Sequence, residues 1–368
     1  MNSSTIRQFH EVRPQAEHGL VWRNPDSFFG YFAWPTVAVD EKGVLYAVCS
    51  GFRARHICPF GKTVMFKSFD EGRTWSVPMV INDTYLDDRD AGVLPLGNNK
   101  ILITWFSHSV PVYQSVYHDA IANDWPASGA LLDLAYPTIP AACARGGSFV
   151  RLSRDGGMTW GETVKIPVSA PHGPILRRDG SLLYLGREMY NTEPDGVVDG
   201  DVCAFESRDE GRTWNLLGKL PLDSAWDDPC EPHVLELDNG RLLGMIRVEH
   251  AEVHLTTFVT VSDDGGCTWT KPEPMGTNGA PPHLMRHSSG AVILTYGRRT
   301  TPCGQRALIS LDNGETWKDE YILRDDAESA DLGYPSTVEL SDGSLLTVYY
   351  QIAAGDKLAS IHWTRWRL

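Results

Sequence analysis

The hydrophobic positions of the chain fall into short paired runs. Six segments each contain two stretches rich in Val, Ile, Leu and Tyr, separated by a polar turn that usually contains Gly. Such runs, bounded by Gly, Asn, Asp and Ser, are typical of β-strands joined by tight turns. The copies begin at Trp34, Asp90, Pro171, Glu231, Pro281 and Tyr334, most of them about 50 to 60 residues apart. This period suits four strands and is too short for a βαβ domain, so each copy predicts one propeller blade.

A second pattern, SxDxGxTW, occurs between the paired runs. Its five copies begin at Ser68, Ser153, Ser207, Ser262 and Ser310. An Asp that accepts backbone N–H groups, a Gly with positive φ and a Thr-Trp pair that enters a strand are the chemistry of a tight turn. We predict that each octapeptide joins the third and fourth strands of a blade, on the face opposite to the strand starts. Its Asp is therefore interpreted as structural.

Six units that cannot bury their own faces are predicted to close into one ring, because closure protects the sheet edges. The expected fold is all-β, a single six-bladed β-propeller spanning residues 1–368. The last strands of the sixth blade are expected within residues 357–366 and are completed by an early segment such as residues 5–12. The interval after the second blade start is long. It predicts a partly helical insertion, about residues 107–147, that forms a binding loop or a subunit contact.

Charge and composition then exclude several classes of protein. The chain has 33 Lys and Arg against 47 Asp and Glu, a formal net charge of −14. Such a surface repels polyphosphate, so nucleic acid is not an expected partner. Without an apolar run of about 18 residues or a leader-like amino terminus, we expect no membrane association and a cytoplasmic location. Seven scattered Cys without CxxC spacing predict free thiols, and no compact ligand spacing indicates a metal or another cofactor.

Polar residues gather at one end of the predicted strands. The first strand of a blade starts, and the second strand ends, at the same face of the ring, so both sets are expected on one rim. Polar groups that converge at a propeller axis are a default ligand site. The rim set includes Trp34, Arg53, Arg89, Asp90, His172, Arg187, Glu231, His233, Arg247 and Tyr334.

Five SxDxGxTW boxes on six predicted blades resemble the sialidase, or BNR, superfamily over nearly the whole chain. The resemblance implies a propeller with Asp-box turns that releases terminal sialic acids. It also implies a Tyr nucleophile assisted by a Glu, an aspartic acid/base and three Arg that bind the sugar carboxylate. The segment from Glu231 to Arg247 resembles the one that supplies the Glu and an Arg, and the segment at Tyr334 resembles that of the nucleophile. A phenol, with a reference pKa near 10, needs such a neighbouring base.

Two parts of the family pattern differ in this chain. Phe32 to Pro35 stand where sialidases carry an Arg before Ile-Pro, and residues 51–63, where they place the acid/base, contain no carboxylate. His56 is the one group in that loop that titrates near neutrality. We therefore predict His56 or Asp90 as the acid/base. The predicted substrate contacts beside Arg247 are Trp34, Arg53, Arg89, His172, Arg187, His233 and Arg306.

The resemblance favours an exo-acting glycoside hydrolase of the sialidase-like superfamily that removes a terminal, acidic sugar from a glycoconjugate or oligosaccharide. The missing first Arg suggests a substrate other than N-acetylneuraminic acid, for example a uronic acid or deoxysugar glycoside. An inverting route with Glu231 or Asp90 as base is one alternative. A lyase is another, in which His or Tyr abstracts a proton next to a uronate carboxylate. A third is a carbohydrate-binding propeller without catalysis, which needs no activated nucleophile.

Overall fold

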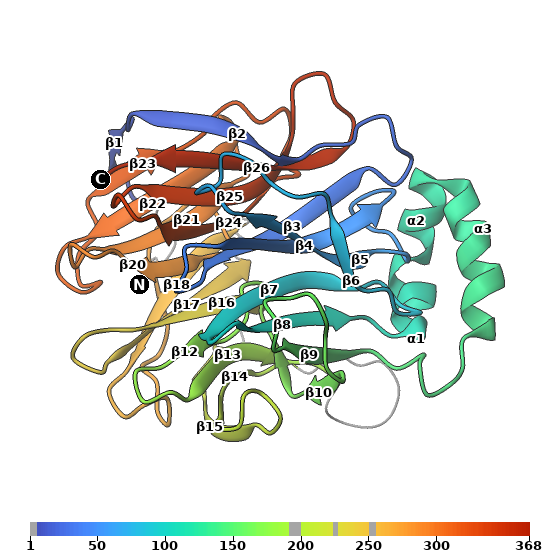
Figure 1. Cartoon of the computed structure of the whole chain (residues 1–368), viewed down its shortest axis with the longest axis horizontal. Coiled ribbons are helices and arrows are strands. Elements are labelled where there is room, and N and C mark those ends of the chain that lie inside the picture. Colours follow the sequence, from blue (N-terminus) through green and yellow to red (C-terminus); the bar gives the residue numbers. More distant parts are fainter. Residues whose placement is uncertain (1–5, 191–199, 224–226, 250–254) are drawn as a thin grey trace.

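Six small sheets form a ring, which confirms the predicted six-bladed β-propeller (Figure 1). The computed structural model describes residues 6–190, 200–223, 227–249 and 255–368. Blade 1 contains β3 (Tyr31–Val39), β4 (Leu45–Arg53), β5 (Lys62–Ser68) and β6 (Met79–Asn82). Blade 2 contains β7 (Arg89–Gly97), β8 (Lys100–Ser107), β9 (Gly147–Ser153) and β10 (Val164–Ile166). Blade 3 contains β11 (Val168–Ser169), β12 (Ile175–Leu176), β13 (Leu182–Glu188), β14 (Val202–Ser207) and β15 (Asn215–Lys219). Blade 4 contains β16 (Asp227–Glu236), β17 (Leu242–Glu249), β18 (Thr256–Ser262) and β19 (Glu273–Pro274). Blade 5 contains β20 (His283–Arg286), β21 (Val292–Arg298), β22 (Gly304–Ser310) and β23 (Asp319–Ile322). Blade 6 contains β24 (Gly333–Glu339), β25 (Leu345–Ile352) and β26 (Ala359–Trp366).

The apolar core lies between neighbouring blades. In one cluster, Val48 and Met65 of blade 1 pack with Ile103 and Trp105 of blade 2. Comparable clusters join the other pairs of adjacent blades. Burial of apolar surface stabilises a fold by about 25 cal/mol per Å². Each blade therefore depends on its two neighbours for most of its stability.

The octapeptide turns lie between the third and fourth strands, as predicted. In the first turn, the Asp70 carboxylate accepts the backbone N–H of Thr74 at 2.9 Å and its hydroxyl at 2.6 Å. Trp75 donates its indole N–H to the carbonyl of Gly72 at 3.0 Å. The same Thr-to-Asp bonds recur in the other four turns. Because the turn itself satisfies each Asp, the octapeptides are structural.

The ring closes differently from the prediction. β2 (Ala16–Trp22), not residues 5–12, pairs with β26 and completes blade 6. β1 (His10–Val12) instead pairs in parallel with β23 at the outer edge of blade 5. The physical reason is the apolar content of β2, because Val21 and Trp22 pack into the cluster between blades 6 and 1. The short β1 carries exposed His10 and Glu11 and has no comparable apolar face. Thr5, the first residue of the expected segment, lies outside the described residues.

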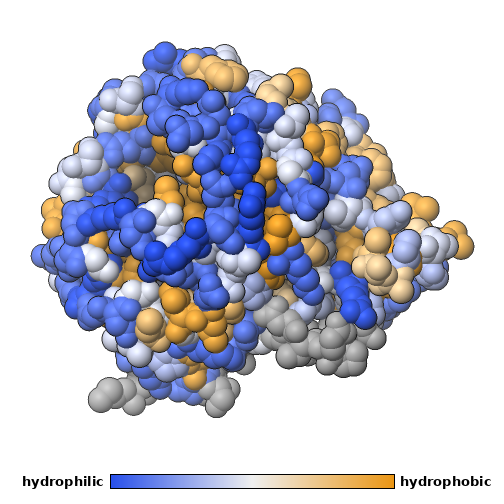
Figure 2. Space-filling view, turned by 60° about the horizontal axis from the view of Figure 1, so that its bottom comes forward, coloured by the Kyte–Doolittle hydropathy of each residue, from blue (hydrophilic) through white to orange (hydrophobic). Residues whose placement is uncertain are grey.

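Between β8 and β9 the chain leaves the ring and forms a helical insertion. It contains α1 (Val110–Val112), a π-helical turn (Tyr113–Tyr117), α2 (His118–Asp124), α3 (Pro126–Ala135) and a 3-10 turn (Tyr136–Thr138). α2 and α3 project from one side of the ring (Figure 1). Figure 2 shows a largely hydrophilic surface with apolar side chains on the insertion, where Val116 and Leu134 are exposed. The inner turns pack against Leu86 and bring Tyr113 and Tyr117 toward the rim of the propeller.

All seven cysteines are free, as predicted. Among the residues with described positions, no helix is long and apolar enough to cross a membrane. Within the same ranges, no group of three or more His, Cys, Asp or Glu side chains is arranged to hold a metal ion.

Candidate active site

Four innermost strands enter their sheets through a bulge. At these points Trp34, Asp90, Glu231 and Tyr334 have φ values of +57°, +49°, +49° and +51°, and the pairing register shifts. A left-handed backbone at a residue other than glycine costs roughly 1–3 kcal/mol, and such residues cluster at functional sites. A bulge also redirects the side chain that it carries. At four of the six predicted strand starts the backbone is thus bent at the rim.

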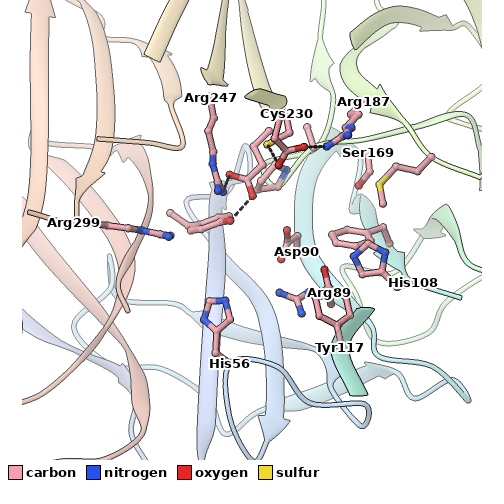
Figure 3. Close-up of a pocket in the computed structure, with 17 residues that line it drawn as sticks. His56, Arg89, Asp90, His108, Tyr117, Ser169, Arg187, Cys230, Arg247 and Arg299 are labelled. Atoms are coloured by element: carbon pink, nitrogen blue, oxygen red, sulfur yellow. Dashed lines mark hydrogen bonds and ion pairs between the residues drawn. The ribbon is translucent and has the colours of Figure 1, made fainter. Parts of the chain in front are cut away.

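Three of these four side chains line one cavity of about 430 Å³, a volume suited to a small ligand. Its polar walls come from blades 1 to 6 and from the helical insertion (Figure 3). The titratable lining residues are His56, Arg89, Asp90, His108, Tyr117, Arg187, Asp228, Cys230, Glu231, Arg247, Arg299 and Tyr334. The cavity therefore lies where the strand starts of blades 2, 4 and 6 meet.

A phenol and a carboxylate meet in this cavity. The Tyr334 hydroxyl donates a hydrogen bond to Oε1 of Glu231 at 2.5 Å. The other carboxylate oxygen of Glu231 accepts from Arg247 at 2.8 Å, and Arg247 also donates to Glu249 at 2.7 Å. Burial, and then the negative charge of Glu231, raise the pKa of Tyr334 well above its usual value. The resting phenol is therefore neutral, and Glu231 is placed to take its proton.

The arginines of the cavity differ in how many ion pairs and hydrogen bonds their guanidinium groups form with the protein. Arg247 is held by two carboxylates, and Arg187 is ion-paired with Asp228. The Arg299 guanidinium lies 5.8 Å from the centre of the Tyr334 ring. No ion pair joins Arg299 to a carboxylate within the described ranges, and its buried Nε has no hydrogen-bond partner there. Arg299 is thus the cavity cation most available to an anionic ligand.

Asp90 and Arg89 lie on another side of the cavity. The Arg89 guanidinium stacks over Trp34 at 4.3 Å and reaches Asp87 at 3.5 Å. Burial raises the pKa of Asp90 to about 7, although Arg89 acts in the opposite direction. In the described part of the chain, Oδ1 of Asp90 has no hydrogen-bond partner. Near neutral pH this carboxyl group can therefore accept a hydrogen bond from a ligand hydroxyl or donate one.

His56 faces the cavity from the loop that follows β4. Its Nδ1 lies 2.8 Å from Oδ1 of Asp331, and its ring packs edge-on against Trp34 with centroids 5.0 Å apart. Burial lowers the pKa of His56, while the hydrogen bond to Asp331 acts to raise it. The structure thus gives the predicted acid/base candidate a carboxylate partner.

The sequence-based set did not include the cavity residues His108, Tyr117, Asp228, Cys230 and Arg299, or Asp331, which contacts His56. Asp331 lies three residues before Tyr334, in the same loop before β24, so its signal was proximity to the predicted nucleophile. Arg299 directly follows β21, where blade 5 returns to the rim. The sequence pattern predicts an arginine at the end of the second strand of a blade, which in blade 5 is Arg298. Arg299 is the next residue in the chain.

Three predicted substrate contacts lie outside the cavity. Trp34 is buried and does not line it, and the guanidinium groups of Arg53 and Arg89 lie 4.6 and 4.3 Å from the centre of its ring. Arg53 is fully buried and forms a bidentate ion pair with Asp87. Arg306 is buried inside blade 5 and donates to the backbone carbonyls of residues 302, 305 and 324. The physical cause is shared: bulky aromatic and guanidinium groups at strand ends fill the space between strands and loops.

His172 and His233 also lie outside the cavity lining. They are buried and, with His283, form a cluster with ring centroids 4.7 to 5.6 Å apart. Nδ1 of His233 accepts the backbone N–H of Leu284 at 2.9 Å, and Nδ1 of His172 lies 3.1 Å from the Thr36 hydroxyl. Burial lowers the pKa of all three rings, that of His233 to about 3. The cluster therefore joins the innermost strands as neutral imidazoles.

We expect this burial to make stability fall in acid. The pKa of His233 is depressed in the folded state, so the unfolded chain takes up its proton first as the pH drops below about 6.5. His233→Asn keeps an acceptor for the N–H of Leu284 but cannot titrate. Between pH 7 and pH 5, urea unfolding of this variant should lose about 2 kcal/mol less stability than the wild type. An unchanged pH slope would show that His233 is not buried as a neutral group.

Comparison with known proteins places this fold. A crystal structure of a protein of unknown function from Dyadobacter fermentans DSM 18053 aligns with a TM-score of 0.77 and 24% identity, over 97% of this chain and 99% of that one. The Hadza microbial sialidase Hz136 aligns with a TM-score of 0.66 and 17% identity, over 95% of this chain and 68% of that one. The Trypanosoma rangeli sialidase in complex with sialic acid aligns with a TM-score of 0.64 and 17% identity, over 97% of this chain and 59% of that one. This chain thus spans about three-fifths of the trypanosomal protein. No curated protein matches it.

The structural neighbours share the propeller, and the sequence itself supplies the family. Residues 136–347 match the family described as the BNR repeat-like domain. The match covers more than half of the chain, from the end of the helical insertion to β25. The chain therefore belongs to the BNR repeat-like domain family, with the propeller fold that sialidases share.

Proposed function

We propose that the protein is an exo-acting glycoside hydrolase that removes a terminal sugar carrying a carboxylate from a glycoconjugate or oligosaccharide. The observation that carries this proposal is the 2.5 Å hydrogen bond between Tyr334 and Glu231 inside a ligand-sized cavity. Arg247 and Arg299 line the same cavity. The sialidase names of the structural neighbours support the same class of substrate. A binding module has no need of a phenol paired with a base.

In the proposed reaction the Tyr334 oxygen attacks the anomeric carbon while its proton passes to Oε1 of Glu231. The bond to the leaving oxygen breaks, and that oxygen takes a proton from His56 or Asp90. Water then attacks the glycosyl-tyrosine and gives one proton back to His56 or Asp90, while the C–O bond to Tyr334 breaks and the phenol regains its proton from Glu231. Because the resting phenol is neutral, it does not repel an anionic sugar as a second carboxylate would. Two displacements at one carbon predict retention of the anomeric configuration.

The arginines give this chemistry its anion preference. A guanidinium binds a carboxylate through two parallel hydrogen bonds, which fixes both position and orientation. Arg299 has donors to offer, and Arg247 links the carboxylate of Glu231 to the same wall. Asp90 and Arg89 can then hold sugar hydroxyls on the other side of the cavity. The carboxylate of the substrate would therefore lie on the Arg299 side of Tyr334.

Release of 4-methylumbelliferone from a panel of sialoside, glucuronide and rhamnoside substrates tests the proposal. We expect turnover of a carboxylated sugar, and Glu231→Gln should lower kcat by at least about 100-fold because the base is lost. Glu236→Gln is the matched control, since Glu236 lies on the same strand and accepts a backbone N–H of residue 178 outside the cavity. Equal activity of the two variants would remove Glu231 from the mechanism.

The product distinguishes the alternatives. A lyase would leave an unsaturated uronate that absorbs in the near ultraviolet, with His56 as the base. A binding propeller would retain a carboxylated sugar in equilibrium binding without releasing the fluorophore. Hydrolysis predicts a saturated free sugar, which proton NMR identifies together with its anomeric configuration. Either of the other two results would replace the hydrolase proposal.

A further inference from the structure

Asp331 is an acceptor for three surrounding donors. Besides Nδ1 of His56 at 2.8 Å, its carboxylate accepts the Tyr31 hydroxyl at 3.0 Å to each oxygen. The Tyr350 hydroxyl donates to Oδ1 at 3.1 Å. Tyr31 and Tyr350 are buried in blades 1 and 6, so the carboxylate is held from two sheets at once. The two phenols thus hold the Asp331 carboxylate in place, and this carboxylate in turn holds the His56 imidazole.

The charge states follow from these contacts. Burial raises the pKa values of Tyr31 and Tyr350 well above their usual range, so both phenols remain donors. Burial alone would raise the pKa of Asp331, but the hydrogen bond from His56 and those from the phenols lower it overall. An ionised Asp331 requires the proton of neutral His56 on Nδ1. Nε2 of His56 then carries the lone pair.

The free nitrogen belongs to the cavity side of the ring. His56 lines the cavity, with 42% of its side chain exposed, while Nδ1 is engaged with Asp331. No hydrogen-bond partner of Nε2 occurs among the described residues. The packing of Trp34 and Tyr31 against the ring limits its rotation. Figure 3 shows His56, Arg89 and Asp90 around the same space.

We propose that Asp331 is a positioning residue that makes His56 the acid–base group of the reaction. In the first step, Nε2–H of protonated His56 gives its proton to the leaving oxygen as the glycosidic bond breaks. In the second step, neutral His56 takes a proton from the attacking water. The sum leaves His56 as it began, so no further reactant is needed. This inference rests on the proposed glycosidase function and selects His56 over Asp90.

A carboxylate that orients a catalytic histidine has a known chemical effect. Replacing it with an amide removes the charge and favours the wrong tautomer, while the ring stays near its place. General acid catalysis matters most when the leaving group is a poor one, and it contributes roughly 100-fold to 10,000-fold. The groups that act on the titration of His56 are Asp331, Tyr31, Arg53 and Arg89. Only Asp331 and Tyr31 contact the imidazole by hydrogen bonds.

The test compares two glycosides of the same sugar, one with a 2,4-dinitrophenyl and one with an alkyl leaving group. Asp331→Asn should lower kcat/KM for the alkyl glycoside about 100-fold or more, and that for the dinitrophenyl glycoside less than about 10-fold. The alkaline limb of the pH profile, assigned to His56, should move. Asp326→Asn is the matched control, because Asp326 belongs to the same loop and pairs with Arg324 outside the cavity. It should change neither quantity.

Equal losses on the two substrates, or an unmoved pH profile, would overturn the inference and leave the glycosidase proposal standing. A wild-type protein that cleaves neither substrate would overturn both. If Asp331→Asn fails to fold, Tyr31→Phe replaces it, since loss of this donor makes Asp331 more basic and should move the alkaline limb to higher pH. Nitrogen-15 spectra of the wild type supply a readout without substrate. They should show neutral His56 protonated on Nδ1, and protonation on Nε2 would contradict the proposal.

Discussion

Tyr334→Phe is expected to lower kcat for release of a carboxylated sugar by at least about 1,000-fold while the propeller stays folded. The substitution removes the attacking oxygen and retains the ring that packs near Trp34 and Tyr350. Glu231 keeps its ion pair with Arg247, so the lost hydrogen bond should cost only about 1–3 kcal/mol of stability. Steady-state kinetics with the best substrate of the panel, together with urea unfolding, measure both effects.

A matched control shows whether the loss of any buried phenol hydroxyl lowers activity, or only the loss of the Tyr334 hydroxyl. Tyr46 donates its hydroxyl to Asp40 at 3.0 Å and does not line the cavity. Tyr46→Phe should therefore lower stability by a similar amount and leave kcat unaltered. If Tyr334→Phe retained more than about a tenth of wild-type activity, the phenol would not be the nucleophile.

Arg299→Met should mainly raise KM. The guanidinium is the cavity cation without a carboxylate partner in the described ranges, so a substrate carboxylate supplies the missing charge. Loss of such a charge-assisted pair is worth about 3 kcal/mol, which corresponds to a roughly 150-fold rise in KM. The methyl ester of the same substrate should lose less than about 5-fold, because it carries no charge to bind.

Arg286→Met provides the control for this experiment. Arg286 belongs to β20 of the same blade, forms an ion pair with Asp238 and lies outside the cavity. It should leave KM unchanged for both the acid and the ester. Equal losses for acid and ester in Arg299→Met would mean that Arg299 shapes the cavity and does not bind the carboxylate.

The repeats made the propeller predictable because a blade is a local unit. The paired apolar runs and the octapeptide turns indicate the order of the strands within each blade. The positions of strand starts such as Glu231 and Tyr334 follow from that order. Ring closure was less predictable, since two amino-terminal segments could have paired with β26. Burial of Val21 and Trp22 decided it.

The site was only partly predictable from the sequence, because how deeply a side chain is buried depends on the three-dimensional structure. Asp90, Glu231 and Arg247 line the cavity. Arg53 has the same position at the end of a second strand as Arg247, yet Asp87 holds it beneath Trp34. The sequence pattern states on which face of the ring a residue lies. Whether that residue lines the cavity or supports its floor depends on partners far away in the chain.

The backbone strain at the rim relates the fold to the proposed chemistry. Left-handed φ values at Asp90, Glu231 and Tyr334 are unfavourable by themselves. The surrounding sheets, joined by the clusters between blades, hold these residues in place. Rigid support of this kind keeps the Tyr334 oxygen beside Glu231 before a substrate arrives, which is the preorganisation that catalysis requires.

The most direct test is capture of the covalent intermediate. A fluorinated glycosyl fluoride of the preferred carboxylated sugar should form the glycosyl-enzyme and slow its hydrolysis, because fluorine destabilises the oxocarbenium-like transition state. Mass spectrometry after digestion should find one added sugar on the peptide that contains Tyr334, and none in Tyr334→Phe. A sugar attached to another residue, or turnover with an inverted anomeric product and no adduct, would contradict the account.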